Sequence, residues 1–219
     1  VRWYLLPDSN SSNTNVLMHS ENVSITLGNG TLVSKVSVDA LGMHDPSNIE
    51  ADKPGVRTVA KEILSTFDEA QIAVLGGGIA SGVNATDKAG TQVDSVTITH
   101  NGTIDGNVYG GGLAQMGGFS STGTSTITLS TGSVVTGDVY AGGIVRANDI
   151  YKYGVYEGGK ATVDTASVTI ENGATVNGTV HTGGYVSKAQ NSGEVSTAVA
   201  SVKNATITLK GNGTFQGLT

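Results

Sequence analysis

The sequence predicts an all-β fold, a right-handed parallel β-helix (β-solenoid) with three short strands in each coil and one short helical insertion. Three observations lead to this prediction: an internal repeat, an excess of glycine over proline, and a scarcity of aromatic residues. Of 219 residues, 32 are Gly and 3 are Pro, which excludes collagen and favours many tight turns. Only 5% are aromatic, fewer than a globular core of this length usually contains.

The repeat consists of a Thr-centred apolar strand, a turn containing glycine, and a second strand that ends in a glycine pair. Three complete copies span Val96–Gly112, Ile127–Gly143 and Val168–Gly184. One such coil cannot bury its apolar face alone, but several stacked coils can. The spacing of the copies varies between the glycine pair and the next Thr-centred strand, so we expect variable loops there.

Incomplete copies flank the complete ones. A half-copy occupies Val74–Gly78, a degenerate copy without the glycine pair occupies Ile25–Leu32, and a further copy occupies Ile207–Gly217. The last copy stops where the next inward Val would fall. We therefore interpret the chain as a fragment of a longer precursor that is cut inside the repeat.

Each position of the repeat has a predicted role. In the Thr-centred strands, such as Val96-Thr97-Ile98, the apolar side chains face one way and Thr the other. Val108, Val139 and Val180 of the second strand face inward and form one ladder through the stacked coils. The aromatic residues after them point the opposite way, and a third strand starts after the glycine pair. These aromatic residues and strand starts are Tyr109, Tyr140, His181, Leu113, Ile144 and Tyr185. A two-sheet solenoid, or two smaller coils per repeat, would give a similar pattern.

One segment departs from the repeat through helical spacing. Apolar residues from Val56 to Phe67 recur at helical intervals, with Lys61 and Glu62 on the other side, as in an amphipathic helix. We expect this helix to cover the side or an end of the solenoid, with a receptor-binding projection as the alternative. The whole chain, 1–219, is then one solenoid with degenerate coils at 1–44, a helical insertion at 45–70 and repeat coils at 71–219.

The candidate binding residues lie in the longest interval between copies, where three of the seven tyrosines fall close together. Tyrosines beside Arg, Lys, Asn and Asp supply contact area and hydrogen bonds at binding surfaces. A sideways hairpin whose rings pack on one another is the alternative. The candidate ligand-binding residues are Arg146, Asn148, Asp149, Tyr151, Lys152, Tyr153 and Tyr156.

The sequence predicts no catalytic residues, no metal site and no cofactor. β-Helix enzymes that cleave polysaccharides place carboxylates on adjacent strands of one face. Asp105 precedes a corner glycine and Asp138 follows one, so we expect these carboxylates at different positions in neighbouring coils. The 4 histidines share no metal-ligand spacing. We expect a protein that is not an enzyme.

Charge and cysteine content limit the possible binding partners and the means of stabilisation. The net charge is −6, and the 12 Lys and Arg residues are scattered, whereas nucleic-acid binding needs a basic groove or stripe. There is no Cys, so a secreted chain would be stabilised by stacking alone. No apolar stretch is long enough to span a membrane.

The unit at Asn101–Gly112, Asn-Gly-Thr-Ile-x-Gly-x-Val-Tyr-Gly-Gly-Gly, resembles repeats in the passenger regions of autotransporter adhesins and related bacterial surface proteins. The likeness runs from about Ile72 to the end, with a weaker echo at 22–40. It implies a β-helix stalk that is exported, displayed outside the outer membrane, and active in adhesion, self-association, biofilm formation or virulence. These repeats are longer than in many self-associating adhesins. Neither a signal peptide nor a C-terminal membrane barrel is recognised in this sequence, so display by another anchor stays open.

Three functional hypotheses follow. The first is a surface adhesin or self-associating stalk, whose partner is a host-surface protein or glycan or another copy of itself. Its polar Thr, Ser and Asn faces favour long hydrogen-bonded contacts. The second is a polysaccharide-active β-helix enzyme, and the third is an inert spacer that presents another domain.

Overall fold

The computed structural model describes residues 15–34, 71–81, 88–115, 117–145, 150–152, 155–187 and 197–219. Within these ranges every regular element is a β-strand, and the two larger sheets are built from parallel pairs. The all-β prediction is therefore confirmed for this part of the chain. The predicted helical insertion at 45–70 lies outside the described residues. No helix long and apolar enough to cross a membrane occurs in the described part.

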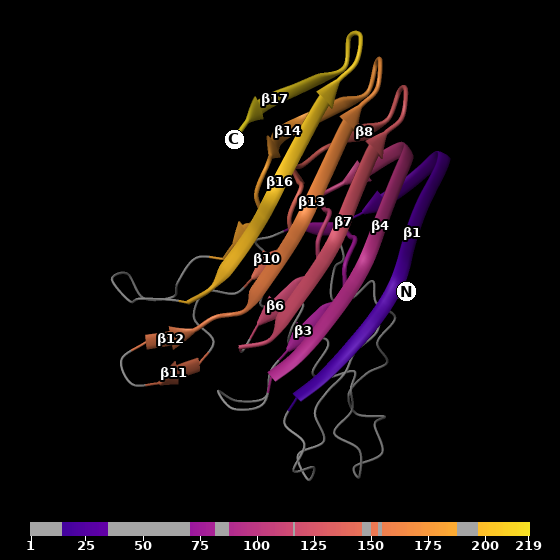
Figure 1. Cartoon of the computed structure of the whole chain (residues 1–219). Coiled ribbons are helices and arrows are strands. Elements are labelled where there is room, and N and C mark those ends of the chain that lie inside the picture. The colour runs from indigo at the N-terminus through magenta and orange to yellow at the C-terminus, as the bar shows by residue number, and fades with distance from the viewer. Residues whose placement is uncertain are drawn as a thin grey trace, which may run out of the picture.

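The longest strands of successive repeat copies lie side by side in one sheet (Figure 1). Each pairs in parallel with the next along the stack. This arrangement brings equivalent residues of neighbouring copies about 4.8 Å apart. In order of pairing, the long strands are β1 (Asn15–Ser34), β4 (Lys88–Asp105), β7 (Phe119–Leu129), β13 (Lys160–Ile170) and β16 (Val199–Leu209).

Shorter strands complete this 11-stranded sheet and form two others. Those in the large sheet are β2 (Ile72–Leu75), β5 (Asn107–Tyr109), β8 (Val134–Val135), β9 (Val139–Tyr140), β14 (Thr175–His181) and β17 (Thr214–Leu218). The 4-stranded parallel sheet contains β3 (Ile79–Ser81), β6 (Leu113–Gln115), β10 (Ile144–Val145) and β15 (Tyr185–Val186). The antiparallel pair is β11 (Ile150–Lys152) and β12 (Val155–Glu157).

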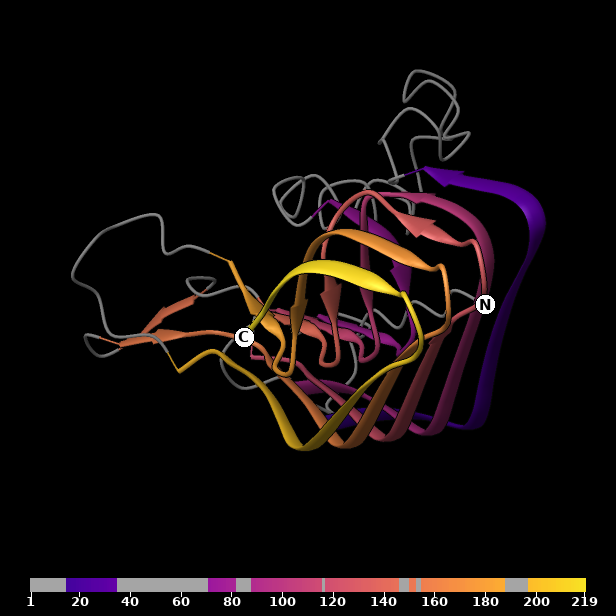
Figure 2. The same ribbon diagram turned by 90° about the horizontal axis from the view of Figure 1, so that it is seen from above.

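The predicted valine ladder is confirmed. Val74, Val108, Val139 and Val180 pair in register along β2, β5, β9 and β14. Each is at most 5% exposed and belongs to the main hydrophobic cluster. Seen along the stack, equivalent strands of successive copies lie behind one another (Figure 2). The repeat in the sequence is thus a repeat in space, with apolar columns running from copy to copy.

The Thr-centred strands are longer than the three residues predicted. β7 has 11 residues and β4 has 18, so part of each segment expected to be a variable loop is strand. The reason lies in small buried hydroxyl residues that the apolar pattern does not mark. Ser125 Oγ donates to the carbonyl oxygen of Gly110 at 3.0 Å, and Ser120 Oγ donates to that of Gly78 at 3.1 Å. These bonds satisfy polar side chains at inward positions.

The first copy pairs two residues away from the predicted alignment. Ile98, and not Val96, pairs with Ile127, because the turn after β4's inward residues is shorter than in the other copies. This places His100 opposite Leu129, in a column where the sequence pattern called for an aliphatic residue. His100 is fully buried. The alternation of faces is unchanged, since the shift is by an even number of residues.

The predicted glycine turns are present after the later long strands. Gly132, Gly173 and Gly211 have φ values of 77°, 76° and 56°, a region that favours glycine. The turn at Gly132 closes with a hydrogen bond from Ser133 N to Ser130 O at 3.0 Å. In the last copy the left-handed residue is Gly211 and not Gly213. That copy also reaches one position further than expected, because Leu218 pairs with Val180.

The aromatic column leaves the main core but is not exposed. Tyr109 and Tyr140 are 0% and 7% exposed and form a second cluster with Leu113 and Ile144. The glycines between these strands allow the chain to bend there at close quarters. A Cβ atom on Gly142 would lie 2.8 Å from the backbone N of Gly184. The predicted third strand is present as β6 and β10, which pair in parallel. Its residues Leu113 and Ile144 pack with the tyrosines of β5 and β9.

Candidate functional site

The two carboxylates considered for catalysis lie in different columns, as predicted. Asp105 Oδ1 accepts a hydrogen bond from the Thr136 hydroxyl at 2.9 Å. Asp138 Oδ1 accepts one from the backbone N–H of Thr179 at 2.8 Å, and Asn107 Oδ1 accepts one from the N–H of Asp138 at 2.6 Å. Asp138 is thus one rung of a column of side chains that bind the backbone of the next copy.

A stack of rings stands beside that column. The Tyr109 and Tyr140 rings lie 4.7 Å apart and nearly parallel, and His181 continues the stack 4.2 Å from Tyr140. His181 therefore takes the place of Tyr in the column, as the sequence indicated. Burial is the main cause that raises the pKa values of both tyrosines, so both phenols stay protonated at neutral pH. The two tyrosine rings pack against one another and supply no acid or base near neutrality.

The sequence-predicted binding residues are described only in part. Arg146, Asn148, Asp149 and Tyr153 lie outside the described residues. The other candidates belong to the β11–β12 pair, where Tyr151 lies opposite Tyr156 and Lys152 opposite Val155. The backbone there is an antiparallel pair beside the parallel sheets (Figure 2). Ligand binding by these residues stays a prediction.

A hydroxyl-rich surface covers the outward face of the long strands beyond their bend. Its residues alternate with buried core residues such as Ile98 and Ile127. One column consists of Thr in all the long strands, since Thr26, Thr99, Thr128, Thr169 and Thr208 pair in register. We name this surface the hydroxyl face. It comprises Asn22, Ser24, Thr26, Ser95, Thr97, Thr99, Thr124, Thr126, Thr128, Thr165, Ser167, Thr169, Asn204, Thr206 and Thr208.

The hydroxyl face has no charged side chain, and none of its residues is buried. Ordinary protein surfaces intersperse charged residues of both signs, at roughly a quarter to a third of positions. Thr suits an exposed strand because it is β-branched and polar. The same chemistry therefore repeats along the stack at about 4.8 Å, and along each strand at about 6.8 Å.

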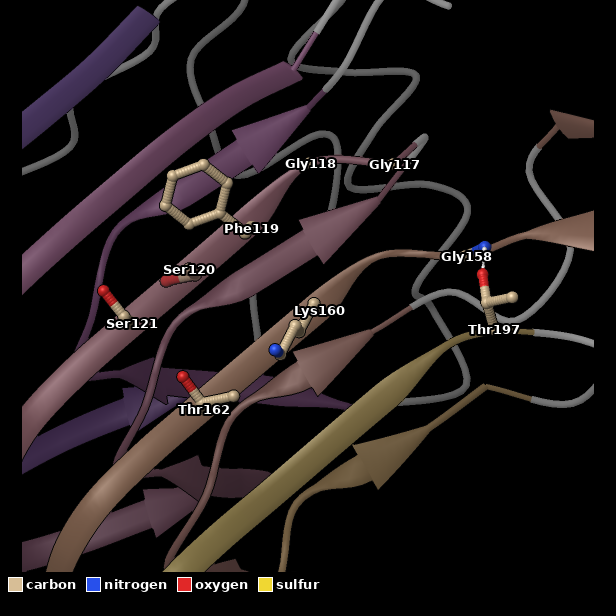
Figure 3. Close-up of a pocket in the computed structure, with 9 residues that line it drawn as sticks. All are labelled: Gly117, Gly118, Phe119, Ser120, Ser121, Gly158, Lys160, Thr162 and Thr197. Carbon is tan, nitrogen blue, oxygen red and sulfur yellow. Dashed lines mark hydrogen bonds between the residues drawn. The ribbon is translucent and has the colours of Figure 1, made fainter. Parts of the chain in front are cut away.

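A groove of about 590 Å³ lies on the same strands, on the other side of the bend. Phe119 and Ser121 of β7 line it together with Lys160 and Thr162 of β13 (Figure 3). Lys160 pairs with Phe119 and Thr162 with Ser121. The bend between groove and hydroxyl face lies at Gly123, where a Cβ atom would be 2.6 Å from the carbonyl oxygen of Asp94.

Glycines form much of the groove's remaining wall. Gly117, Gly118 and Gly158 line it without side chains, and Gly158 N–H donates to Thr197 Oγ1 at 3.3 Å (Figure 3). Sequence analysis did not identify this groove, because Phe119 and Lys160 belong to no repeated motif. The signal that could have indicated the groove is one aromatic residue, Phe119, and one cationic residue, Lys160, in segments that otherwise consist mainly of small residues.

Comparison with known proteins found no match to a family model, a curated protein or a solved structure. Across the described ranges, no group of three or more His, Cys, Asp or Glu side chains is placed to hold a metal ion. Among the described residues, the hydroxyl face and the groove are two surfaces that could recognise a ligand. Both lie on the outward side of the long strands.

Proposed function

We propose that this chain is part of a bacterial cell-surface β-solenoid, a right-handed parallel β-helix that acts as an adhesive stalk and not as an enzyme. Parallel pairing of successive copies supports the solenoid, as does the valine column that runs through them. The likeness to autotransporter passengers supports export and display outside the outer membrane. Within the adhesive role, the favoured partner is another copy of the chain.

The uncharged hydroxyl face is the observation that carries this proposal. The hydroxyl face itself brings no charges together, although Asp94, Asp164 and Lys203 lie exposed at its edge and the chain as a whole has a net charge of −6. Each Thr or Ser hydroxyl can donate one hydrogen bond and accept others, so equivalent faces can pair whichever way they meet. A hydroxyl array of constant spacing also matches its own copy in register.

The area of the hydroxyl face determines how strong a single contact between two faces is. From the strand and residue spacings, it covers roughly 500 Å², whereas a stable interface buries about 800 Å² on each partner. One contact between these faces is thus weak. In a longer stalk, further copies of the repeat would add contacts, and avidity would make the association strong. Clumping of cells that each display many stalks follows from this arithmetic.

A polysaccharide-active enzyme is less well supported. Asp105 and Asp138 lie in different columns, and each already accepts a hydrogen bond. An acid and base pair needs both carboxyl groups to flank one scissile bond. An inert spacer is the remaining alternative, and cell aggregation separates it from the stalk proposed here.

The test displays the fragment on cells and measures aggregation of wild type and two variants. Thr126→Lys puts a charge at the centre of the hydroxyl face, and we expect it to abolish clumping because facing lysines repel. Thr131→Lys adds the same charge at an exposed turn residue, and we expect it to clump like wild type. Folded wild-type stalks that do not clump would leave the spacer as the function.

The Tyr-rich segment is tested separately by adhesion to host cells or glycans. Replacing Tyr151, Tyr153 and Tyr156 together by Ser should reduce measured binding if these rings contact the ligand. Unchanged binding would show that the site lies elsewhere on the stalk.

A further inference from the structure

We propose that the groove at Phe119 and Lys160 binds an anionic saccharide, a uronic-acid unit of an acidic polysaccharide. The inference deepens the adhesive part of the proposed function by naming a ligand class and a site. It does not require self-association, because the groove and the hydroxyl face lie on opposite sides of the bend in the long strands.

The first support is the state of the cation. Lys160 is exposed at the groove, and in the described part of the chain its ammonium group forms no ion pair. Lys210, in contrast, lies 2.9 Å from a carboxylate oxygen of Glu171. On the same strand, the nearest acid with a described side chain is Asp164, four residues on and roughly 13 Å away. At physiological salt, charges more than about 8 Å apart are largely screened. Among the described side chains at the groove, Lys160 is thus the charged group, and it favours an anion.

The second support is an aromatic ring on the strand beside that of the cation. Phe119 pairs with both Lys160 and Gly90 in the sheet, and its ring occupies the space where a Gly90 side chain would be. The ring thus lies across the neighbouring strand while it remains partly exposed in the groove. A partly exposed ring supplies rigid apolar contact area, which suits the C–H face of a sugar.

The third support is the row of hydroxyl groups two residues further along. Ser121 and Thr162 face the same way as Phe119 and Lys160 and are about 6.8 Å from them along the strands. This distance is close to the width of one sugar ring. A short chain of uronic acids can therefore place a carboxylate at Lys160, a sugar ring at Phe119 and hydroxyls at Ser121 and Thr162. The glycine wall lets a chain of sugars pass near the backbone.

Other anions fit this groove less well. A phosphate group is usually held by several N–H donors or by Arg in a bidentate pair, and the groove offers one ammonium group. A stable protein interface buries about 800 Å² on each partner, which is more than the few residues that line this groove can supply. The combination of one cation, one ring and several hydroxyls suits an acidic sugar.

The experiment titrates the purified fragment with tetragalacturonate and, in parallel, with the neutral sugar maltotetraose. We expect tetragalacturonate to bind, with weaker binding at high salt, and maltotetraose to bind far less. Lys160→Gln should weaken the tetragalacturonate affinity by about tenfold or more, since it removes a hydrogen bond to a charged group. Lys203→Gln removes an exposed lysine of β16 and should leave the affinity unchanged.

A Phe119→Leu variant, which keeps an apolar side chain over Gly90, should also weaken binding. The inference is wrong if folded wild type does not bind tetragalacturonate at millimolar concentration, or if Lys160→Gln and Lys203→Gln bind alike. Equal binding of maltotetraose would overturn the claim of charge recognition. Thr126→Lys should bind the sugar like wild type while failing to clump, and Lys160→Gln should still clump. Failure of this inference is thus distinguishable from failure of self-association.

Discussion

One inward column and one outward column of the long strands differ in how strictly their residues repeat. On the inward face the residues of one column change from copy to copy, as in Val96, Ser125 and Ala166, which pair in register and are all buried. On the outward face Thr99, Thr128 and Thr169 are identical. The inward face needs only residues that fill the interior and have their polar atoms satisfied. A β-branched polar residue suits each exposed position of that column, and in the function proposed above the uniform Thr column serves recognition.

The first prediction concerns the loss of inward volume and has the largest expected effect. Ile127→Ala removes a fully buried side chain from the middle strand of the stack and should lower the free energy of unfolding by about 2–5 kcal/mol. Thr126→Ala, one residue away on the outward face, should change it by less than about 0.5 kcal/mol. Urea denaturation followed by circular dichroism measures both. Similar losses for the two variants would contradict the assignment of faces.

The second prediction extends the comparison to the backbone at the glycine bend. Gly111, Gly142 and Gly183 form one column, but only the first two are covered by a following copy. A Cβ atom on Gly142 would lie 2.8 Å from Gly184 N, whereas one on Gly183 would meet nothing within 4 Å. Gly142→Ala should therefore cost about 1–3 kcal/mol through overpacking.

Gly183→Ala is the matched control and should be close to neutral in the same denaturation experiment. Equal destabilisation by both variants would mean that the glycines serve backbone conformation and not close approach. That outcome would also contradict the tight contact between copies at this bend.

Sequence analysis succeeded where a repeated position has one physical requirement. The valine column could be predicted because Val108, Val139 and Val180 recur at a fixed offset from glycine. The turn at Gly132 could be predicted because few other residues adopt a positive φ. These features are local, and the repeat displays them several times.

It failed where a buried position accepts several kinds of residue. The length of β7 was missed because Ser120 and Ser125 are inward but polar, and only their bonds to Gly78 and Gly110 explain this. The alignment of the first copy was missed because His100 stands in an aliphatic column. The groove was missed because Phe119 and Lys160 pair only across neighbouring strands, and no spacing in the sequence encodes that pairing.

The third prediction concerns His100, the buried polar residue in an otherwise aliphatic column. Neither ring nitrogen of His100 makes a well-formed hydrogen bond. Burial is the main cause that lowers its pKa, and weaker interactions with the backbone of Gly102 and Val134 oppose that shift. The folded state therefore favours neutral His100, while the unfolded chain takes up a proton near its ordinary pKa of about 6.5. The folded state binds fewer protons, so this contribution is present above about pH 6.5 and is lost as the pH falls.

His100→Leu should remove that contribution to the pH dependence and raise the free energy of unfolding by about 1–3 kcal/mol, because it replaces an unsatisfied polar side chain. Leu suits the column, in which Leu129 is the neighbour. The measurement is urea denaturation at pH 5 and pH 8 for both proteins. A variant with the same pH dependence as wild type would show that His100 is not the titrating group.

The smallest effect is expected in the column of Asn107 and Asp138, which lies at a corner and belongs to neither face of the long strands. Asp138 is partly exposed, and its carboxylate binds the backbone N–H of Thr179 in the next copy. Asn107 makes the equivalent bond in the copy before, which shows that an amide oxygen serves as well as a carboxylate. Asp138→Asn should therefore keep the free energy of unfolding within about 0.5 kcal/mol, whereas Asp138→Ala should lower it by about 1 kcal/mol. Denaturation of the two variants at neutral pH tests this directly. If Asp138→Asn were as destabilising as Asp138→Ala, the negative charge, which lies 3.6 Å from His181 Nε2, would matter more than the hydrogen bond from Thr179. Asp138 would then be a candidate functional carboxylate.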